Sequence, residues 1–161
     1  MRPEQALADI LVDRSLKLVT AESLTCGMIA NTLGAVEGSS EWLCGGIVAY
    51  VTETKFTVLG VTPGPVITER CAREMAEGAK RLFGADIAVS VTGVGGPGPE
   101  EDQPAGTVFI GVAFGDEVRV QRLRFAGGPE QVLGATTRAA IASTLEVLTQ
   151  GGVREVERGA G

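Results

Sequence analysis

The sequence predicts an α/β fold, a single-domain three-layer α/β/α sandwich with a mixed sheet. In the first two thirds of the chain, short apolar β-prone segments alternate with helical segments, which indicates parallel strands. Two strand-like segments then follow one another without a helix, which indicates an antiparallel hairpin at one edge. The length of 161 residues suits one domain with its own core. We expect this domain over residues 1–150 and a flexible tail over residues 151–161.

The first expected elements are a helix over residues 3–14 and a strand over residues 18–21. The helix has an apolar stripe at helical spacing, and Pro3 suits its first turn. The strand is short, apolar and β-prone, and a second helix follows it as far as about Leu33. The strand therefore ends in a turn that opens a helix.

A strand over residues 43–50 and a long helix over residues 68–83 come next. The strand is almost wholly apolar, so we expect it to be buried, and its two glycines predict a close backbone approach or a bulge. A short helix begins at Thr52 or Thr54, and Thr68 suits the N-cap of the long helix.

The remaining elements are strands over residues 86–92, 107–113 and 118–125 and a helix over residues 129–148. The first of these strands is nearly continuous in apolar residues, so we expect both of its faces to be covered. The glycine-rich segment 93–106 has no regular pattern, and both a lid and a disordered loop fit its acidic part, residues 99–103.

Composition narrows the classes of function. The net charge of −6 and the scattered basic residues argue against a nucleic-acid partner, and no apolar run or basic leader predicts a membrane partner. Three widely spaced cysteines fit neither a disulfide framework nor a zinc site, so we expect a cytoplasmic protein. The chain has no histidine, which excludes the Ser-His-Asp triad, the Cys-His pair and the usual zinc hydrolase sites.

Three polar loops, residues 22–27, 50–55 and 92–98, each follow a predicted strand. If those strands are parallel, the loops meet at one edge of the sheet, where open α/β folds bind ligands. Ser23 could then act as a nucleophile, provided that burial or a neighbouring cation lowers the pKa of Lys55 from roughly 10.4 so that it accepts a proton. The ordinary alternatives are a helix-capping serine and a solvated lysine.

Main-chain N–H groups offer a second device at this edge. The glycine-rich turn after the third strand could hold an oxyanion or a phosphate, and the start of the helix after Ser23 favours an anion. Tyr50 is either a site residue or a wedge at the end of a strand. The glycine spacing matches neither the Walker A nor the dinucleotide-binding pattern.

Several short motifs occur together in the order typical of one family. They are Ala21-Glu22-Ser23-Leu24-Thr25-Cys26-Gly27, Gly45-Gly46-Ile47-Val48-Ala49-Tyr50, Glu53 with Lys55, Val91-Thr92-Gly93-Val94-Gly95-Gly96-Pro97 and Pro104-Ala105-Gly106-Thr107. Over about residues 7–148 the chain resembles the CinA C-terminal domain family, the nicotinamide mononucleotide deamidases, in its stand-alone form.

The resemblance implies an enzyme that converts nicotinamide mononucleotide to nicotinic acid mononucleotide and ammonia without a metal or other cofactor. It implies Ser23 as the nucleophile and Lys55 as the general base, with Tyr50 supporting the lysine. The implied substrate-binding residues are Glu22, Thr25, Cys26, Gly27, Gly46, Thr92 and Gly93. It also implies a small-molecule mononucleotide as the partner, together with further copies of the chain in a homo-oligomer.

The chain departs from the family pattern at Leu24, where the family has a cysteine, at Val51-Thr52, where it has Ser-Asn, and at two places that bear on ligand binding. Cys26 replaces a glycine, and a side chain there could block a ligand or oppose a positive φ. Where the family has Gly-Asp-Arg-Glu and a further arginine, this chain has Gly127-Gly128-Pro129-Glu130 and then Val132-Leu133. Arginines at those positions would suit a phosphate, and Arg124 and Arg138 are the cations left nearby. The alternative is therefore a catalytically inactive ligand-binding or scaffold module that has lost its phosphate contacts.

Overall fold

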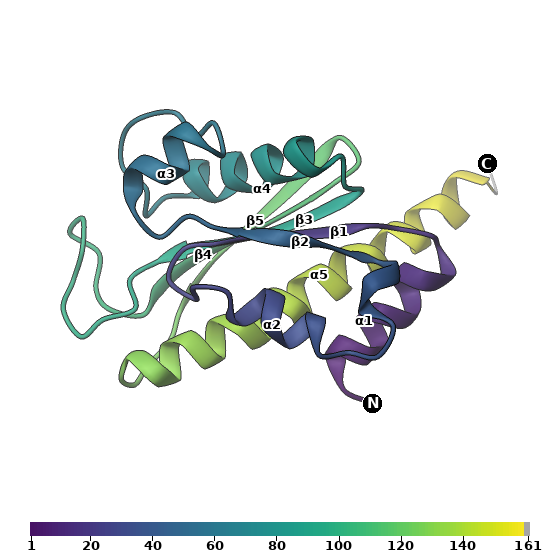
Figure 1. Ribbon diagram of the computed structural model, residues 1–161, viewed down its shortest axis with the longest axis horizontal. Helices are drawn as coiled ribbons and strands as arrows, with labels where there is room; N and C mark the ends of the chain where they lie inside the picture. Colours follow the sequence, from purple (N-terminus) through teal and green to yellow (C-terminus); the bar gives the residue numbers. More distant parts are fainter. Residues whose placement is uncertain (160–161) are drawn as a thin grey trace.

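A mixed five-stranded sheet lies between two layers of helices in the computed structural model (Figure 1). The structure describes the backbone of residues 1–159 and the side chains of residues 1–150. The strand order is β2-β1-β3-β4-β5, with β1 and β2 parallel, β1 and β3 parallel, and the last two strands antiparallel. The strands are β1 (Leu18–Glu22), β2 (Leu43–Val48), β3 (Ile87–Gly93), β4 (Thr107–Phe114) and β5 (Glu117–Arg124). The predicted α/β sandwich with a mixed sheet is confirmed.

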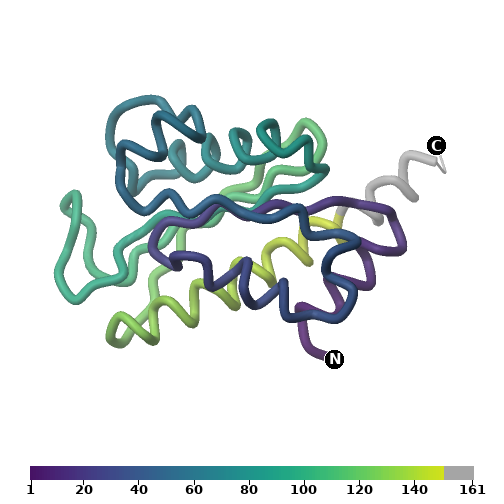
Figure 2. Tube along the Cα trace, viewed as in Figure 1, coloured from purple at the N-terminus to yellow at the C-terminus, as the bar shows by residue number. Residues whose placement is uncertain are grey.

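The helices divide between the two faces of the sheet (Figures 1 and 2). One face carries α1 (Pro3–Asp13), α2 (Met28–Gly34) and α5 (Pro129–Gly159), and the other carries α3 (Thr52–Thr57) and α4 (Glu69–Phe83). A single 3₁₀ turn, η1 (Ser39–Glu41), leads into β2. The predicted flexible tail, residues 151–161, lies outside the residues whose side chains are described and stays a prediction.

Each face of the sheet has its own apolar core. Leu7 and Leu11 of α1 and Ile29 of α2 are fully buried in one core, while Met75 of α4 is fully buried in the other. The α3–α4 connection packs so closely on α4 that a Cβ at Gly78 would lie 2.0 Å from the carbonyl oxygen of Leu59. Within residues 1–159, none of the helices has both the length and the apolar character needed to cross a bilayer.

The prediction that β2 is a buried strand is wrong. β2 lies at an edge of the sheet, its residues alternate between half-buried and exposed, and Val48 is 45% exposed. Apolar composition cannot distinguish an edge strand from a central one, because strand order is a long-range property. The predicted close approach is present, since a Cβ at Gly46 would lie 2.1 Å from the Thr20 hydroxyl oxygen.

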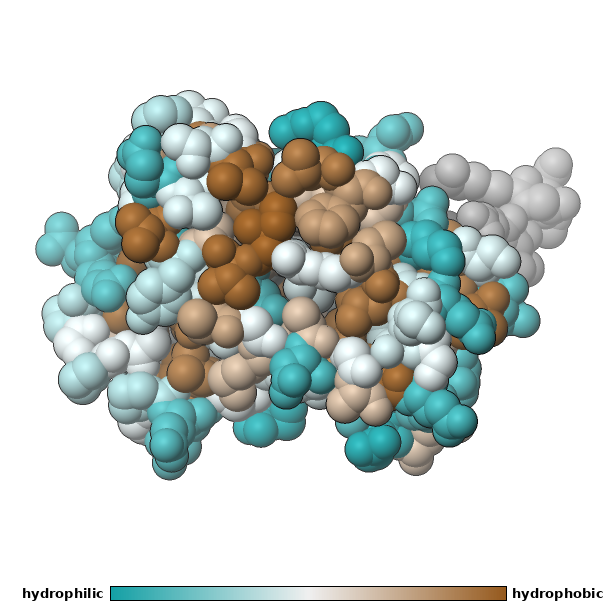
Figure 3. All heavy atoms as spheres, viewed as in Figure 1, coloured by the Kyte–Doolittle hydropathy of each residue, from teal (hydrophilic) through white to brown (hydrophobic). Residues whose placement is uncertain are grey.

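Apolar side chains gather on the face around this edge strand (Figure 3). The exposed large apolar residues of β2, α4 and the chain around α3 are Val48, Val51, Val58, Leu82 and Phe83. A contiguous apolar patch of this kind is typical of an interaction surface. It is compatible with the expected homo-oligomer, which stays a prediction.

The parallel strands bring the three polar loops to one edge of the sheet. β1, β2 and β3 run in the same direction, so their carboxyl ends lie together. The loop from Val94 to Gly106, which projects beyond the sheet (Figure 2), is held at its base by two hydrogen bonds: Val94 N–H to Thr107 O at 2.9 Å and Gly106 N–H to Val94 O at 2.8 Å. This edge is where a ligand site is expected.

Candidate active site

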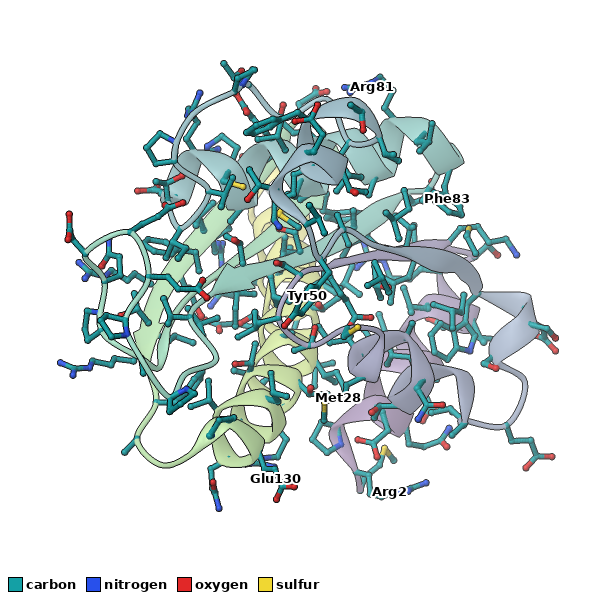
Figure 4. The ribbon with its side chains drawn as sticks, turned by 60° about the vertical axis from the view of Figure 1, so that its left-hand side comes forward. Arg2, Met28, Tyr50, Arg81, Phe83 and Glu130 are labelled. Carbon is teal, nitrogen blue, oxygen red and sulfur yellow. The ribbon has the colours of Figure 1, made fainter. Side chains whose placement is uncertain are left out.

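A cleft of about 200 Å³ lies among the loops that follow β1, β2 and β3 and the first turns of α5. The residues that line it are Ser23, Leu24, Tyr50, Gly93, Gly95, Gly96, Glu100, Pro129 and Leu133. Two of the three predicted catalytic residues, Ser23 and Tyr50, therefore face the same cleft (Tyr50 is labelled in Figure 4). The third, Lys55, lies behind this lining.

Ser23 sits directly after β1 and keeps its hydroxyl free. Its N–H donates to the carbonyl of Val91 at 3.2 Å, and its carbonyl accepts from the N–H of Cys26 at 3.1 Å. Ser23 is 8% exposed, and its hydroxyl has no hydrogen-bond partner in the described part of the chain. The helix-capping interpretation of Ser23 is therefore wrong, because no backbone N–H of α2 donates to it.

Glu22 is the residue that holds the start of α2. Its side chain is 1% exposed, and its carboxylate accepts from the N–H of Ile29 at 2.9 Å and the N–H of Ala30 at 3.0 Å. The Thr25 hydroxyl donates to the same carboxylate at 2.6 Å. Free N–H groups at a helix N-terminus attract an anion, and here the chain supplies that anion itself. The expected anion site at this helix is occupied by Glu22.

Lys55 is buried on α3, and its amine contacts two backbone carbonyls. The side chain is 2% exposed, and Nζ donates to Ala49 O at 2.8 Å and to Tyr50 O at 3.3 Å. Burial lowers the pKa of Lys55, while Cys71, Glu100 and Glu101 act in the opposite direction. The solvated-lysine interpretation is therefore wrong, and the lowered pKa is the condition that a general base requires.

Two further polar residues lie on the same side of the sheet as Lys55. The Thr92 hydroxyl is buried and donates to Val66 O at 2.7 Å. Burial raises the pKa of the Cys71 thiol to about 11, with Lys55 and Thr92 opposing the shift. Cys71 is thus a neutral thiol near the lysine at ordinary pH. No group of three or more metal-ligating side chains occurs among the described residues.

The other residues expected to bind substrate differ in where they lie relative to the cleft. Gly93 lines the cleft, and a Cβ there would lie 2.5 Å from Thr107 O. Cys26 and Gly27 form the turn into α2 with positive φ values of 49° and 98°. Gly46 lies within β2, opposite Thr20, and is not among the residues that line the cleft. The substrate-binding roles of these residues stay predictions.

Comparison with known protein families extends the description from the site to the whole chain. The model of the CinA C-terminal domain matches residues 2–148. The chain belongs to the CinA C-terminal domain family. It is 41% identical over 130 residues to a CinA-like protein of Thermotoga maritima, covering 77% of this chain and 32% of that protein. A CinA-like protein of Frankia casuarinae is 41% identical over 129 residues, covering 77% and 30%. This CinA domain thus spans about a third of the length of these relatives.

Solved CinA structures share the fold along most of their length. A CinA superfamily protein from Klebsiella pneumoniae 700603 superposes with a TM-score of 0.89 at 35% identity, covering 92% of this chain and 96% of that one. A CinA superfamily protein from Escherichia coli gives a TM-score of 0.88 at 34% identity, covering 90% and 88%.

Six residues that line the cleft of this CinA domain are not among the predicted site residues. They are Leu24, Gly95, Gly96, Glu100, Pro129 and Leu133. Pro129 and Leu133 occupy the segment in which the family pattern commonly carries arginines, so the sequence departure falls on the cleft itself. Glu100 lies in the irregular glycine-rich loop between β3 and β4. In the sequence, Glu100 is marked only by its place in an irregular loop, and Pro129 and Leu133 only by their place in a segment that departs from the family pattern. Neither feature by itself indicates that a residue lines the cleft.

Proposed function

We propose that the chain is an amidohydrolase that converts the carboxamide of a nicotinamide compound to a carboxylate and ammonia. Nicotinamide mononucleotide is the substrate expected from the resemblance. The observation that carries the proposal is the Ser23 hydroxyl, which faces a cleft without a hydrogen-bond partner among the described residues. The buried Lys55 amine supports the proposal. It donates to the carbonyls of Ala49 and Tyr50, and Tyr50 lines the cleft.

The first step is attack by Ser23 on the carboxamide carbon. A neutral lysine amine has two N–H groups and one lone pair. The two backbone carbonyls accept the N–H groups of Lys55, which leaves its lone pair to take the Ser23 proton as Oγ bonds to carbon. Gly95 and Gly96 line the cleft, and their N–H groups have no acceptor in the described part of the chain, so these two residues are the candidates for binding the developing oxyanion.

The second step breaks the C–N bond and then frees the serine. The Lys55 ammonium returns its proton to the leaving nitrogen, which departs as ammonia, and Ser23 is left as an ester. A water molecule then loses a proton to the neutral Lys55 and attacks the ester carbon. The acid product leaves, and the proton on Lys55 returns to the Ser23 oxygen.

The test is ammonia release from nicotinamide mononucleotide and from the corresponding nucleoside. Ser23→Ala and Lys55→Ala should each lower kcat by at least about 10³-fold, as removal of a nucleophile or its base does in other hydrolases. Normal turnover by both variants would refute the proposal.

A second candidate is a catalytically inactive ligand-binding module. It is favoured by the charge of the cleft, because no Lys or Arg occurs among the described residues that line it. A thermal shift with the mononucleotide and no ammonia from either compound would support this candidate. Ammonia release that depends on Ser23 would exclude it.

A further inference from the structure

The loop between β3 and β4 contains a tight turn over residues 100–103, here called the acidic turn. Glu100 and Gln103 exchange two backbone hydrogen bonds, of 3.1 Å and 2.8 Å, around Glu101 and Asp102. Glu101 and Asp102 have φ values of 48° and 59°. Positive φ at both central residues defines a type I′ turn, for which Asn-Gly or Asp-Gly is the usual sequence. The conformation of Glu101 therefore depends on contacts outside the turn.

The carboxylate of Glu101 holds the acidic turn against the connection between α3 and α4. Its oxygens accept from the N–H of Val66 at 3.0 Å and from the N–H of Ile67 at 2.9 Å. Both donors are buried residues, and neither N–H has another acceptor among the described residues. Elsewhere the acidic turn has one side-chain bond, from Arg122 to Gln103 at 3.2 Å. Because hydrogen bonds to a carboxylate are about twice as strong as neutral ones, Glu101 is the main attachment of this turn.

Val66 also binds the end of β3. Its carbonyl accepts from the buried hydroxyl of Thr92 at 2.7 Å. The chain is thereby attached to Val66 at two points, by Thr92 before the loop and by Glu101 within it. Four residues of the cleft lining lie between these two points: Gly93, Gly95, Gly96 and Glu100. The position of this part of the lining therefore depends on both attachments.

The acidic turn also acts on Lys55 through its charge. The groups that act on the Lys55 ammonium are Cys71 of α4 and Glu100 and Glu101 of the loop, and all three raise its pKa against the larger effect of burial. Burial raises the pKa of the Cys71 thiol to about 11, so Cys71 is neutral at ordinary pH and the two carboxylates supply the charge. Removal of the Glu101 charge should therefore lower the pKa of Lys55.

We infer that Glu101 is a positioning residue, which fixes the cleft-lining part of the loop to the α3–α4 connection and keeps a carboxylate near the proposed base. Glu101 is not among the residues that line the cleft, so it acts through the loop. The inference rests on the proposed amidohydrolase function, because Gly95 and Gly96, the candidates for binding the oxyanion, lie in the segment that Glu101 holds. Groups that bind a developing charge are effective only when they are held in place.

The test compares Glu101→Gln with the matched control Asp102→Asn. Each substitution removes one carboxylate charge from the acidic turn, but of the two residues Glu101 alone binds the two N–H groups and acts on Lys55. Hydrogen–deuterium exchange should be about tenfold faster at the Val66 and Ile67 amides in Glu101→Gln and unchanged in Asp102→Asn. The amides of β1 serve as the internal reference, so that a general loss of folding is recognised.

The kinetic readout is the pH profile of kcat/KM for ammonia release from nicotinamide mononucleotide. In Glu101→Gln the plateau at high pH should fall about tenfold, because the lining residues are misplaced. The midpoint of the rise should move to lower pH, because Lys55 loses a neighbouring negative charge. Asp102→Asn should change neither. The absence of any one of these changes in Glu101→Gln, or equal changes in Asp102→Asn, would overturn the inference.

Amide exchange also separates this inference from the proposed function. If the unmodified protein releases no ammonia, the proposed function fails, and the pKa of the Lys55 amine, measured by nuclear magnetic resonance, replaces the kinetic profile. Faster exchange at Val66 and Ile67 together with a lower pKa of Lys55, in Glu101→Gln and not in Asp102→Asn, would uphold the inference. Any other result would overturn it.

Discussion

The amine of Lys55 lies 2.8 Å from the carbonyl oxygen of Ala49, and the N–H of Ala49 lies 2.8 Å from the carbonyl oxygen of Glu22. A single residue directly after β2, Ala49, therefore connects the proposed base to the residue before the proposed nucleophile. The relative position of Lys55 and Ser23 thus depends on the pairing of β1 with β2, and not on contacts between the two side chains.

The buried state of Lys55 predicts the pH dependence of activity. A general base must be neutral, so kcat/KM for ammonia release should rise with pH as Lys55 loses its proton. Because burial lowers the pKa of Lys55, this rise should be centred below the roughly 10.4 of a free lysine. Lys55→Arg should abolish the rise together with the activity, since arginine keeps its proton. A pH–rate profile centred at or above the free-lysine value would contradict the assignment.

The same lowered pKa predicts how stability changes with pH. Between the folded-state pKa of Lys55 and roughly 10.4, the unfolded chain binds one proton more than the folded chain, so the free energy of unfolding rises with pH. The slope is at most about 1.4 kcal/mol per pH unit. Denaturation of the protein and of Lys55→Met, which has no titrating amine, should show the stability of the variant falling relative to the unmodified protein across this window. A constant difference would contradict the prediction.

Two serines provide a test that separates catalysis from folding. Ser23→Ala should remove at least about 10³-fold of kcat and leave the melting temperature nearly unchanged, because the hydroxyl has no hydrogen-bond partner among the described residues. Ser90 is the matched control, since its buried hydroxyl donates to Ala72 O at 2.6 Å. Ser90→Ala should retain kcat and lose about 0.5–1.5 kcal/mol of stability. A loss of stability in Ser23→Ala equal to that in Ser90→Ala would assign Ser23 a structural role.

The sequence was sufficient for the features that depend on local pattern. The alternation of strands and helices predicted the three parallel strands, and Thr68 was correctly placed as an N-cap that accepts from Cys71 N at 3.0 Å. It was insufficient where a residue's environment depends on the order of strands. The apolar β2 was expected to be buried and instead forms an edge, because neighbours in the sheet are remote in the chain.

In the candidate site too, some features follow from local sequence pattern and others depend on residues that are remote in the chain. The loops that meet at the sheet edge were predictable, since parallel strands end together. The role of Glu22 was not, because its carboxylate bonds to N–H groups seven and eight residues later. The position of Leu133 in the cleft lining was not predictable either, because Leu133 lies on a helix more than 100 residues after Ser23.

The capping role of Glu22 predicts a loss of stability on substitution. Glu22→Gln removes the charge that complements the start of α2 and leaves a single oxygen where two accept hydrogen bonds from Ile29 and Ala30. Urea denaturation should show a loss of about 1–3 kcal/mol. Thr25→Val, which replaces the hydroxyl that donates to Glu22 with a methyl group, should cost about 1 kcal/mol. Equal stability of Glu22→Gln and the unmodified protein would show that the capping bonds contribute nothing.

The turn into α2 contains a non-glycine residue in the left-handed region. Cys26 has φ 49°, a conformation that costs an L-residue roughly 1–2 kcal/mol and a glycine almost nothing. Cys26→Gly should relieve this strain, but glycine also gains entropy in the unfolded chain, so the net gain should be at most about 1 kcal/mol. For a domain of this length that corresponds to a rise in melting temperature of about 2–4 °C.

Ser15, with φ 54°, is the matched control on the α1–β1 connection, distant in sequence from the cleft-lining loops. If Ser15→Gly and Cys26→Gly raise the melting temperature alike, but only Cys26→Gly changes KM for the carboxamide, then the cysteine affects the ligand as well as the backbone. A lower melting temperature for both would contradict the assignment of strain to these two residues.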